Sequence, residues 1–327
     1  MTMHRRPVLI DTDTASDDAV ALIMALRSPL VEVKAICTVA GNVPLEQATR
    51  NALYTVELCD ADVPVFRGCA KPLVRELHNA TWFHGQDGLG DHGFAPNGTP
   101  ASGHGADAII NIVRATPGIE IITLGPLTNL AMALHRCPEI AKSVARCVVM
   151  GGAPCCEGNV TPAAEFNIWV DPDAARIVFA SGMPIEMIGW QLSRQDAVLV
   201  ERDIEQIRAL QTPLAAFAIE ANSVAAEAYR LQTGESGISL PDPVAMAVLL
   251  KPELKLETTT HYVAIECDSD LTRGMTVVDR LGVSADPRNL PPWKDVIRGP
   301  KTEICWKLDV PGWKAELIAA LTTESRS

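Results

Sequence analysis

The chain has 327 residues, of which 47% are hydrophobic and 21% charged, the composition of an ordinary globular protein. Its formal net charge of −12 argues against nucleic acid polymers and anionic membranes as partners, because both carry negative charge. No apolar run approaches the ~18 residues that a membrane-spanning helix needs. No signal-peptide-like apolar segment follows Arg5 and Arg6 either. We therefore expect a soluble protein.

The nine cysteines are scattered along the chain and show no zinc-binding spacing. Most of them, such as Cys37, Cys147 and Cys267, lie in apolar, strand-like runs, where a reduced cysteine behaves as a small hydrophobic residue. This usage predicts a reducing, cytoplasmic location.

Apolar runs alternate with helical patterns through the first 190 residues, which predicts repeated βα units. The expected strands are 8–10, 33–40, 119–124, 147–150 and 185–188, and the expected helices are 17–27, 45–58, 106–115, 129–135 and 172–180. Further strands are expected at 261–266, 275–278 and 304–308, with helices at 244–250 and 313–321. The pattern predicts an α/β fold in which one open, mainly parallel but mixed, Rossmann-like sheet is flanked by helices. No domain boundary is evident, so residues 1–327 are expected to form one domain.

Each of the first five strands ends in a turn of distinctive composition. The first ends in an acidic run, and the others end in glycine: Gly41-Asn42, Gly125-Pro126, Gly151-Gly152 and Gly189. The carboxyl ends of parallel strands lie along one edge of a sheet, where ligands bind. We expect these five ends to line a single crevice.

Two segments interrupt the βα pattern, at about 77–105 and 220–240. The first contains Trp82, Phe83, His84 and several glycines with little periodicity. A long loop of this kind is usually functional or disordered, and its aromatic content favours a lid over the crevice. The second segment ends a polar, helical stretch and is also expected to be lid-like.

The acidic run from Asp11 to Asp18 reads D-T-D-T-A-S-D-D. Four carboxylates this close repel one another unless a cation with a preference for oxygen ligands joins them. In the alternative interpretation Asp11 and Asp13 form a turn while Ser16 or Asp17 caps the following helix. One or two aspartates fit that alternative, but four do not, so the run favours a metal or catalytic site.

Two other stretches carry polar residues whose role the sequence leaves open. Asp242 lies between two prolines at the start of an apolar helix, where it could be an ordinary N-cap. Asn159 and the run Glu165-Phe166-Asn167 follow the Gly151-Gly152 strand end and suit the binding of a polyol, or belong to a surface loop. No dinucleotide-binding, P-loop or nucleophile-elbow motif is present.

Taken together, these stretches resemble the inosine-uridine preferring nucleoside hydrolases. The run Asp11 to Ala19 is similar to that family's D-x-D-x-x-x-D-D-A signature. Similar blocks follow in the family's order over roughly residues 8 to 250: 40–42, 84–89, 124–129, 150–152, 158–167 with 171–172, and 242–243. The resemblance implies hydrolysis of the N-glycosidic bond of ribonucleosides to ribose and free base.

The resemblance also implies roles for individual residues. One Ca²⁺ would be bound by Asp13, Asp18, Asp242 and the backbone carbonyl of Leu124, with Asp13 acting also as the general base. Ribose would be held by Asp17, Asn42, Met150, Asn159, Glu165, Phe166 and Asn167. Asp11 is expected to be structural. The family implies a homodimer or homotetramer whose partner is a small-molecule ribonucleoside.

One departure from the family pattern concerns the leaving base. The inosine-uridine members have a histidine immediately before the late aspartate, where this chain has Pro241, which has no proton to donate. His84 could supply the proton, or Trp82 could stack on the base; both could equally be ordinary loop packing. The stretch from Gly189 to Arg194 also departs from the family sequence, which leaves the base preference open.

Two other functions remain possible from the sequence. A phosphotransferase could use the D-x-D motif with Mg²⁺, although Ala15 replaces the expected Thr or Val and no matching lysine segment is evident. A non-catalytic, Ca²⁺-dependent nucleoside binder could have lost its histidine at position 241. The complete set of Asp13, Asp17, Asp18 and Asp242 favours the hydrolase.

Overall fold

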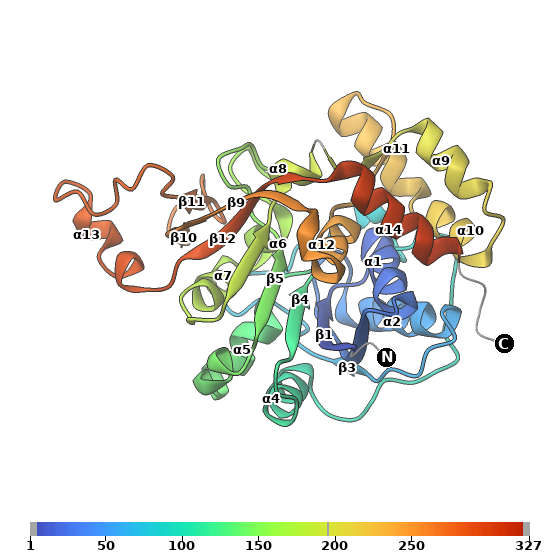
Figure 1. Ribbon diagram of the computed structural model, residues 1–327, viewed down its shortest axis with the longest axis horizontal. Coiled ribbons are helices and arrows are strands. Elements are labelled where there is room, and N and C mark those ends of the chain that lie inside the picture. The colour runs from blue at the N-terminus through green and yellow to red at the C-terminus, as the bar shows by residue number, and fades with distance from the viewer. Residues whose placement is uncertain (1–4, 195, 323–327) are drawn as a thin grey trace.

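An eight-stranded sheet forms the centre of the molecule in the computed structural model, which describes residues 5–194 and 196–322 (Figure 1). The strand order is β3-β2-β1-β4-β5-β6-β12-β9, and all neighbours are parallel except β12 and β9. The strands are β1 (Arg6–Thr12), β2 (Val31–Thr38), β3 (Val65–Arg67), β4 (Glu120–Thr123), β5 (Arg146–Met150), β6 (Ile185–Ile188), β9 (Lys255–His261) and β12 (Thr302–Leu308). The predicted mixed, mainly parallel sheet is confirmed.

The central strands are buried on both faces because their apolar side chains alternate between two separate cores. In β1, Val8 and Ile10 pack into one core, whereas Leu9 between them packs into the other. Successive side chains of a strand point to opposite faces, so a continuous apolar run suits a strand that is covered on both sides.

Two sets of helices cover these faces (Figure 1). The first core is closed by α1 (Ser16–Arg27), α2 (Leu45–Leu58), α10 (Pro213–Glu220), α12 (Pro241–Leu250) and α14 (Val310–Thr322). The second is closed by α4 (Gly105–Ala115), α5 (Thr128–Arg136) and α7 (Pro172–Phe179). The fully apolar segment that follows Asp242 is therefore a helix buried on all sides.

The order of the first six strands reverses direction between β1 and β4. Chain connections run one way from β1 to β2 and β3, and the other way from β4 to β5 and β6. A crevice opens at such a reversal, outside the carboxyl ends of the two strands. The acidic run follows β1 at this point, so the topology places it where open α/β sheets bind ligands.

The C-terminal part differs from the prediction. The strand expected at 261–266 is divided between the end of β9 and β10 (Val263–Ile265), which pairs with β11 (Thr276–Val278) outside the main sheet. The strand β9 was missed because its side chains are exposed or half-buried along its length, so it lacks the alternating pattern of a half-buried strand. The β10–β11 region projects from one end of the main sheet (Figure 1).

Shorter elements complete the described chain. They are α3 (Thr81–His84), α6 (Phe166–Val170), α8 (Trp190–Ser193), β7 (Val198–Leu199), α9 (Glu201–Arg208), α11 (Ser223–Thr233), β8 (Ile238–Ser239) and α13 (Leu290–Trp293). All nine cysteines lie in the described ranges and are free thiols. None of the helices within those ranges combines the length and apolar character needed to cross a membrane.

Two arginines at the opposite end of the sheet from the acidic run hold the C-terminus of α12. Arg6 donates to the carbonyls of Leu249 and Leu250 at 2.9 and 2.7 Å. Arg146 donates to those of Val248 and Leu249 at 3.0 and 3.1 Å. Arg146 also forms a two-pronged ion pair with Glu186, at 2.7 Å for each contact. The last turn of a helix has carbonyls without intrahelical partners, so these arginines supply the missing donors.

Replacement of Arg146 tests whether it stabilises the C-terminus of α12. Arg146→Met should lower the free energy of unfolding by about 2–3 kcal/mol, because it leaves the last carbonyls of α12 without these donors and the half-buried Glu186 with Lys255 alone. Urea denaturation measures the change. Arg67→Met is the matched control, because Arg67 pairs with Glu46 where both side chains are exposed, and its loss should cost less than about 0.5 kcal/mol. Equal effects of the two substitutions would contradict the proposed cap.

Candidate functional site

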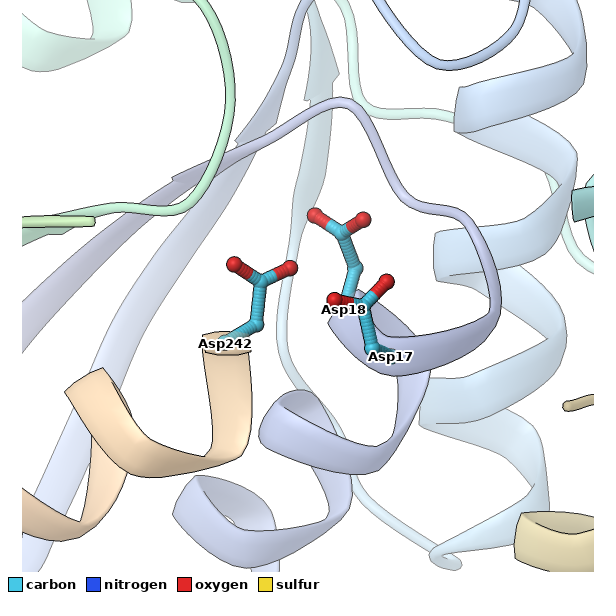
Figure 2. Close-up of side chains that lie close together, drawn as sticks. All are labelled: Asp17, Asp18 and Asp242. Carbon is cyan, nitrogen blue, oxygen red and sulfur yellow. The ribbon is translucent and has the colours of Figure 1, made fainter. Parts of the chain in front are cut away.

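Three buried carboxylates from two helices meet near the ends of β1 and β4, where the order of the strands reverses. Asp17 and Asp18 lie in the first turn of α1 and Asp242 in the first turn of α12. Their side chains point toward a common point (Figure 2), and one oxygen of each lies within 4.8 Å of the others. Three carboxylate oxygens at this separation suit a divalent cation that prefers oxygen ligands.

Asp18 is held in place by three donors. Its Oδ1 accepts a hydrogen bond from Thr12 Oγ1 at 2.5 Å, and its Oδ2 accepts from the backbone N–H of Ala15 at 2.9 Å and from Asn42 Nδ2 at 3.3 Å. The contact with Ala15 satisfies the N–H of the residue at the N-cap of α1. The capping interpretation is therefore partly correct, with Asp18 rather than Ser16 or Asp17 as the capping side chain.

Asp13 lies next to this cluster and is completely buried. Its Oδ2 accepts a hydrogen bond from the backbone N–H of Asn42 at 2.6 Å, whereas its Oδ1 has no partner. A Cβ atom at Gly41 would lie 2.1 Å from Oδ2, and one at Gly125 would lie 2.5 Å from Oδ1. Only glycine at these two strand ends leaves room for the carboxylate.

Burial raises the pKa values of all these carboxylates. The pKa of Asp17 rises to about 8, first through burial and then through repulsion from Asp18. Burial and the neighbouring carboxylates hold the pKa values of Asp13 and Asp242 well above their usual range. Burial also raises the pKa of Asp18. Without a positive charge the cluster holds protons, so a bound cation is what would ionise it near neutral pH.

Asp11 belongs to the strand rather than to the cluster. Its Oδ1 accepts a hydrogen bond from Asn129 Nδ2 at 2.7 Å, and the same amide also donates to the carbonyl of Thr38 at 3.0 Å. Burial raises the pKa of Asp11 to about 7. These contacts tie β1 to β2 and to the start of α5.

A cavity opens above the carboxylates and brings together most of the predicted residues. Asp13 and Asp18 are completely buried next to Asp17 and Asp242 and are not among its lining residues. The predicted residues that line it come from four helices, the end of β5 and three loops: Asp17, Asn42, Trp82, His84, Leu124, Met150, Asn159, Glu165, Phe166, Asn167 and Asp242. The single crevice expected from the strand ends is confirmed.

Glu165 and Asn159 organise the wall of this cavity through backbone contacts. Glu165 precedes α6 and accepts hydrogen bonds from the N–H groups of Asn167, Gly152 and Ile168 at 2.8, 2.8 and 3.3 Å. Asn159 Oδ1 accepts from the N–H of Phe166 at 2.9 Å. These residues therefore shape the loop in addition to facing the cavity.

Asn167 connects two strand ends at the cavity floor. Its Nδ2 donates to the carbonyl of Leu124 at 2.8 Å and lies 3.3 Å from both the carbonyl and the sulfur of Met150. The Leu124 carbonyl keeps one lone pair for a further partner, because a carbonyl oxygen has two.

The two aromatic candidates in the 77–105 segment differ in their surroundings. His84 is buried, and its Nδ1 lies 2.8 Å from Ser16 Oγ and 3.9 Å from Asp17 Oδ1. Burial lowers the pKa of His84 to about 3, so its imidazole is neutral at neutral pH. Trp82 lines the cavity but keeps 59% of its surface exposed. His84 therefore belongs to the floor, and Trp82 to the rim.

Several lining residues were not predicted as site residues: Ala80, Phe83, Val160, Trp190, Tyr229, Gln232, Ser239 and Pro241. Trp190 follows the Gly189 strand end, and this position alone could have identified it. Tyr229 and Gln232 lie three residues apart on α11, which packs against α3. The helix lies in the 220–240 segment that was expected to be lid-like, but the sequence does not indicate which of its side chains face the cavity.

Known proteins are similar to this protein along nearly its whole chain. The model of the family described as inosine-uridine preferring nucleoside hydrolase matches residues 8–314. The pyrimidine-specific ribonucleoside hydrolase RihA of Salmonella enteritidis PT4 (strain P125109) is 40% identical over 296 residues, covering 89% of this chain and 94% of the relative.

Solved structures agree with the sequence matches. The plant nucleoside hydrolase PpNRh1 superposes with a TM-score of 0.91 at 33% identity, covering 98% of this chain and 100% of that chain. A purine-preferring ribonucleoside hydrolase from Gardnerella vaginalis gives a TM-score of 0.85 at 30% identity, covering 97% and 98%. The chain therefore belongs to the inosine-uridine preferring nucleoside hydrolases, enzymes that cleave the N-glycosidic bond of ribonucleosides.

Proposed function

We propose that the protein hydrolyses the N-glycosidic bond of ribonucleosides to ribose and free base in a Ca²⁺-dependent reaction. The observation that carries this proposal is the group of buried carboxylates at the floor of a cavity whose walls offer both donors and acceptors. A sugar ring presents several hydroxyls at once, so its binding site needs both kinds of group.

The donor set fits a hard divalent cation. Asp13 Oδ1 and Asp17 Oδ1 are buried and have no hydrogen-bond partner, which is costly unless a cation or a ligand meets them. Ca²⁺ would be held by two of the three clustered carboxylates, Asp18 and Asp242, together with Asp13 and the carbonyl of Leu124. The third clustered carboxylate, Asp17, would face the ribose hydroxyls. When bound, Ca²⁺ supplies positive charge that ionises the carboxylates and polarises water.

Asp13 is the proposed general base. Once ionised, its unpartnered Oδ1 can accept the proton of the attacking water, while Oδ2 stays fixed by the N–H of Asn42. The glycines at 41 and 125 leave space for the carboxylate and restrict its movement. A base that is held in one orientation acts with little reorganisation.

Side chains of the cavity floor and walls would hold the ribose. Asp17 and Asn42 would bind the hydroxyls near the carboxylates, Met150 would lie beneath the ring, and Asn159, Glu165, Phe166 and Asn167 would form the far wall. Positive charge builds on the sugar as the glycosidic bond breaks. Acidic and amide oxygens around the ring would stabilise that charge.

The leaving base would lie toward the rim, near Trp82 and His84. Because His84 is neutral, its proposed assistance to the leaving base is a hydrogen bond from the imidazole and not proton transfer from an imidazolium. The segments at about 77–105 and 220–240 supply α3 and α11, which contact each other at the cavity. We propose that they act together as a lid.

The relatives guide the choice of nucleobase to test. The Salmonella relative, at 40% identity, is named as pyrimidine-specific, and the Gardnerella relative, at 30%, as purine-preferring. We take pyrimidine ribonucleosides as the first substrates to test. A cytoplasmic location and a homodimeric or homotetrameric assembly complete the proposal.

A substrate panel tests the reaction. Incubation with uridine, cytidine, inosine, adenosine and nicotinamide riboside should release free base and ribose, fastest from a pyrimidine nucleoside. Chromatography of the products measures the release. Phosphate release from p-nitrophenyl phosphate without base release from any nucleoside would instead support a phosphotransferase. Calorimetric nucleoside binding with no turnover would support a non-catalytic binder.

Removal of the proposed base tests the mechanism. Asp13→Asn should lower kcat by about 10²–10⁴-fold, because the amide cannot accept the proton of water. The fold should survive, since the amide oxygen can still accept the hydrogen bond from Asn42. Asp107→Asn is the matched control, because Asp107 forms an exposed ion pair with Arg136, and its activity should be unchanged. Near-normal turnover by the Asp13 variant would exclude Asp13 as the general base.

Stability as a function of pH tests the cation site. When a chelator has removed Ca²⁺, the folded protein holds a proton on Asp11 up to about pH 7 and on Asp17 up to about pH 8. The unfolded chain releases both protons near pH 4. The free energy of unfolding should therefore fall as pH rises from about 4 to 8, by up to about 1.4 kcal/mol per unit for each group. Ca²⁺ binds the ionised form, so it should raise Tm more at pH 8 than at pH 5. A Ca²⁺-induced Tm shift that is absent or independent of pH would contradict the site.

A further inference from the structure

The residue before Asp242 is Pro241, which has no proton to donate, so the neutral His84 is the cavity residue proposed above to assist the departing base. Most polar side chains on its walls already have partners. Tyr229 donates to Glu235 at 2.6 Å, and Gln232 donates to the carbonyl of Asn159 at 2.8 Å. Asn42 and Asn167 donate to Asp18 and to the Leu124 carbonyl. Each of these contacts commits a donor to the protein itself, although the amides of Asn42 and Gln232 each carry a second N–H.

Among cavity-lining residues in the described ranges, three have a buried side-chain polar atom with no hydrogen-bond partner: Asp17, Trp190 and Ser239. Asp17 belongs to the carboxylate cluster. Ser239 can donate or accept, so it does not define the chemistry of its partner. Trp190 is different, because an indole N–H only donates and does not ionise. The missing partner of Trp190 must be an acceptor.

The backbone fixes Trp190 at the cavity wall. It is the first residue of α8, directly after β6, and its N–H donates to the carbonyl of Gly152 at 2.8 Å. The next side chain, Gln191, donates to the carbonyl of Cys305 in β12 at 2.7 Å. Trp190 itself is only 8% exposed. The backbone that carries the buried indole is therefore anchored to the turn after β5 and to β12, the two strands that flank β6.

We propose that Trp190 donates a hydrogen bond from Nε1 to the nucleobase and stabilises the charge that develops on it. The proposal rests on the proposed hydrolase function, in which the sugar hydroxyls are met by the carboxylates and amides of the floor. The nucleobase is then the part of the substrate that has one proposed donor, His84, and can accept a second. Ring nitrogens and carbonyl oxygens of a nucleobase are acceptors, which is what an indole N–H requires.

The bond changes are balanced without proton transfer from Trp190. The bond between C1′ and the base nitrogen breaks, and its electron pair moves to the base. The oxygen of water bonds to C1′, and its proton passes to Asp13. The base takes its proton from solvent after departure, while the indole keeps its own. The N–H contributes because a hydrogen bond strengthens as its acceptor gains negative charge.

Trp190→Phe removes the N–H and keeps an aromatic ring in the wall. The test compares two substrates on the same preparation: the nucleoside that wild-type enzyme cleaves fastest, and 4-nitrophenyl β-D-riboside, whose leaving group needs little assistance. The variant should lose about 10- to 100-fold in kcat on the nucleoside and less than about threefold on the nitrophenyl riboside. A ratio of the two rates is independent of the fraction of folded enzyme.

Controls separate this inference from the function on which it rests. Trp306→Phe removes an indole N–H that donates to Thr259 at 2.6 Å outside the cavity, and it should leave both rates unchanged. Failure of wild-type enzyme to cleave any nucleoside would refute the proposed function itself. Equal losses of Trp190→Phe on both substrates, or no loss on either, would overturn the role of Trp190 alone. So would a loss that disappears with the 5′-deoxynucleoside, because the N–H would then bind the sugar.

If Trp190→Phe has no folded fraction by circular dichroism, Trp190→His replaces it, because imidazole is smaller and keeps a ring N–H. Its loss on the nucleoside relative to the nitrophenyl riboside should be smaller than tenfold but measurable. Equal losses on the two substrates would again overturn the proposal.

Discussion

Repulsion between buried carboxylates is the constraint on which this site depends. Two unit charges within 4.8 Å repel by about 3 kcal/mol or more at an effective dielectric constant of 20, and three such charges repel in three pairs. The fold holds them together through the packing of α1 against α12, whose side chains are almost entirely apolar and buried. Each buried Leu, Ile or Val contributes about 1.5–3 kcal/mol, so the two helices can hold the carboxylates together. The cluster reduces the repulsion by holding protons when it has no cation. The cluster is therefore ready to bind one.

The same polar groups both shape the site and face the ligand. Asp18 satisfies the N–H of Ala15 at the start of α1, and Glu165 satisfies three N–H groups around the start of α6. Asn167 ties the ends of β4 and β5 together through the carbonyls of Leu124 and Met150. A substitution at one of these residues changes local backbone structure as well as ligand contacts. Capping at α1 thus involves Asp18 instead of the predicted Ser16 or Asp17, and Glu165 caps α6, whereas ligand contacts of these two residues belong to the proposed function.

Much of this arrangement was predictable because it depends on local patterns. Continuous apolar runs predicted the central strands, and the turn residues after each run predicted one crevice. The partnership of Asp242 with Asp18 required the family resemblance, since more than 200 residues separate them in the sequence. The segment that contains α11 was expected to be lid-like, but Tyr229 and Gln232 were missed because the face of α11 that meets α3 and the cavity depends on tertiary packing. The edge strand β9 was missed because its side chains are exposed or half-buried, although its backbone pairs with β12.

The orientation of α12 links the two ends of the sheet. The N-terminal ends of α1 and α12 converge on the carboxylates, where the partial positive charge of each helix favours anions. At the other end of α12, Arg6 and Arg146 donate to its last carbonyls, where the helix favours cations. These arginines also pair with Glu120 and Glu186, which belong to β4 and β6. The helix that carries Asp242 is thus anchored to the strands whose opposite ends line the cavity, so the position of this carboxylate follows from the sheet itself.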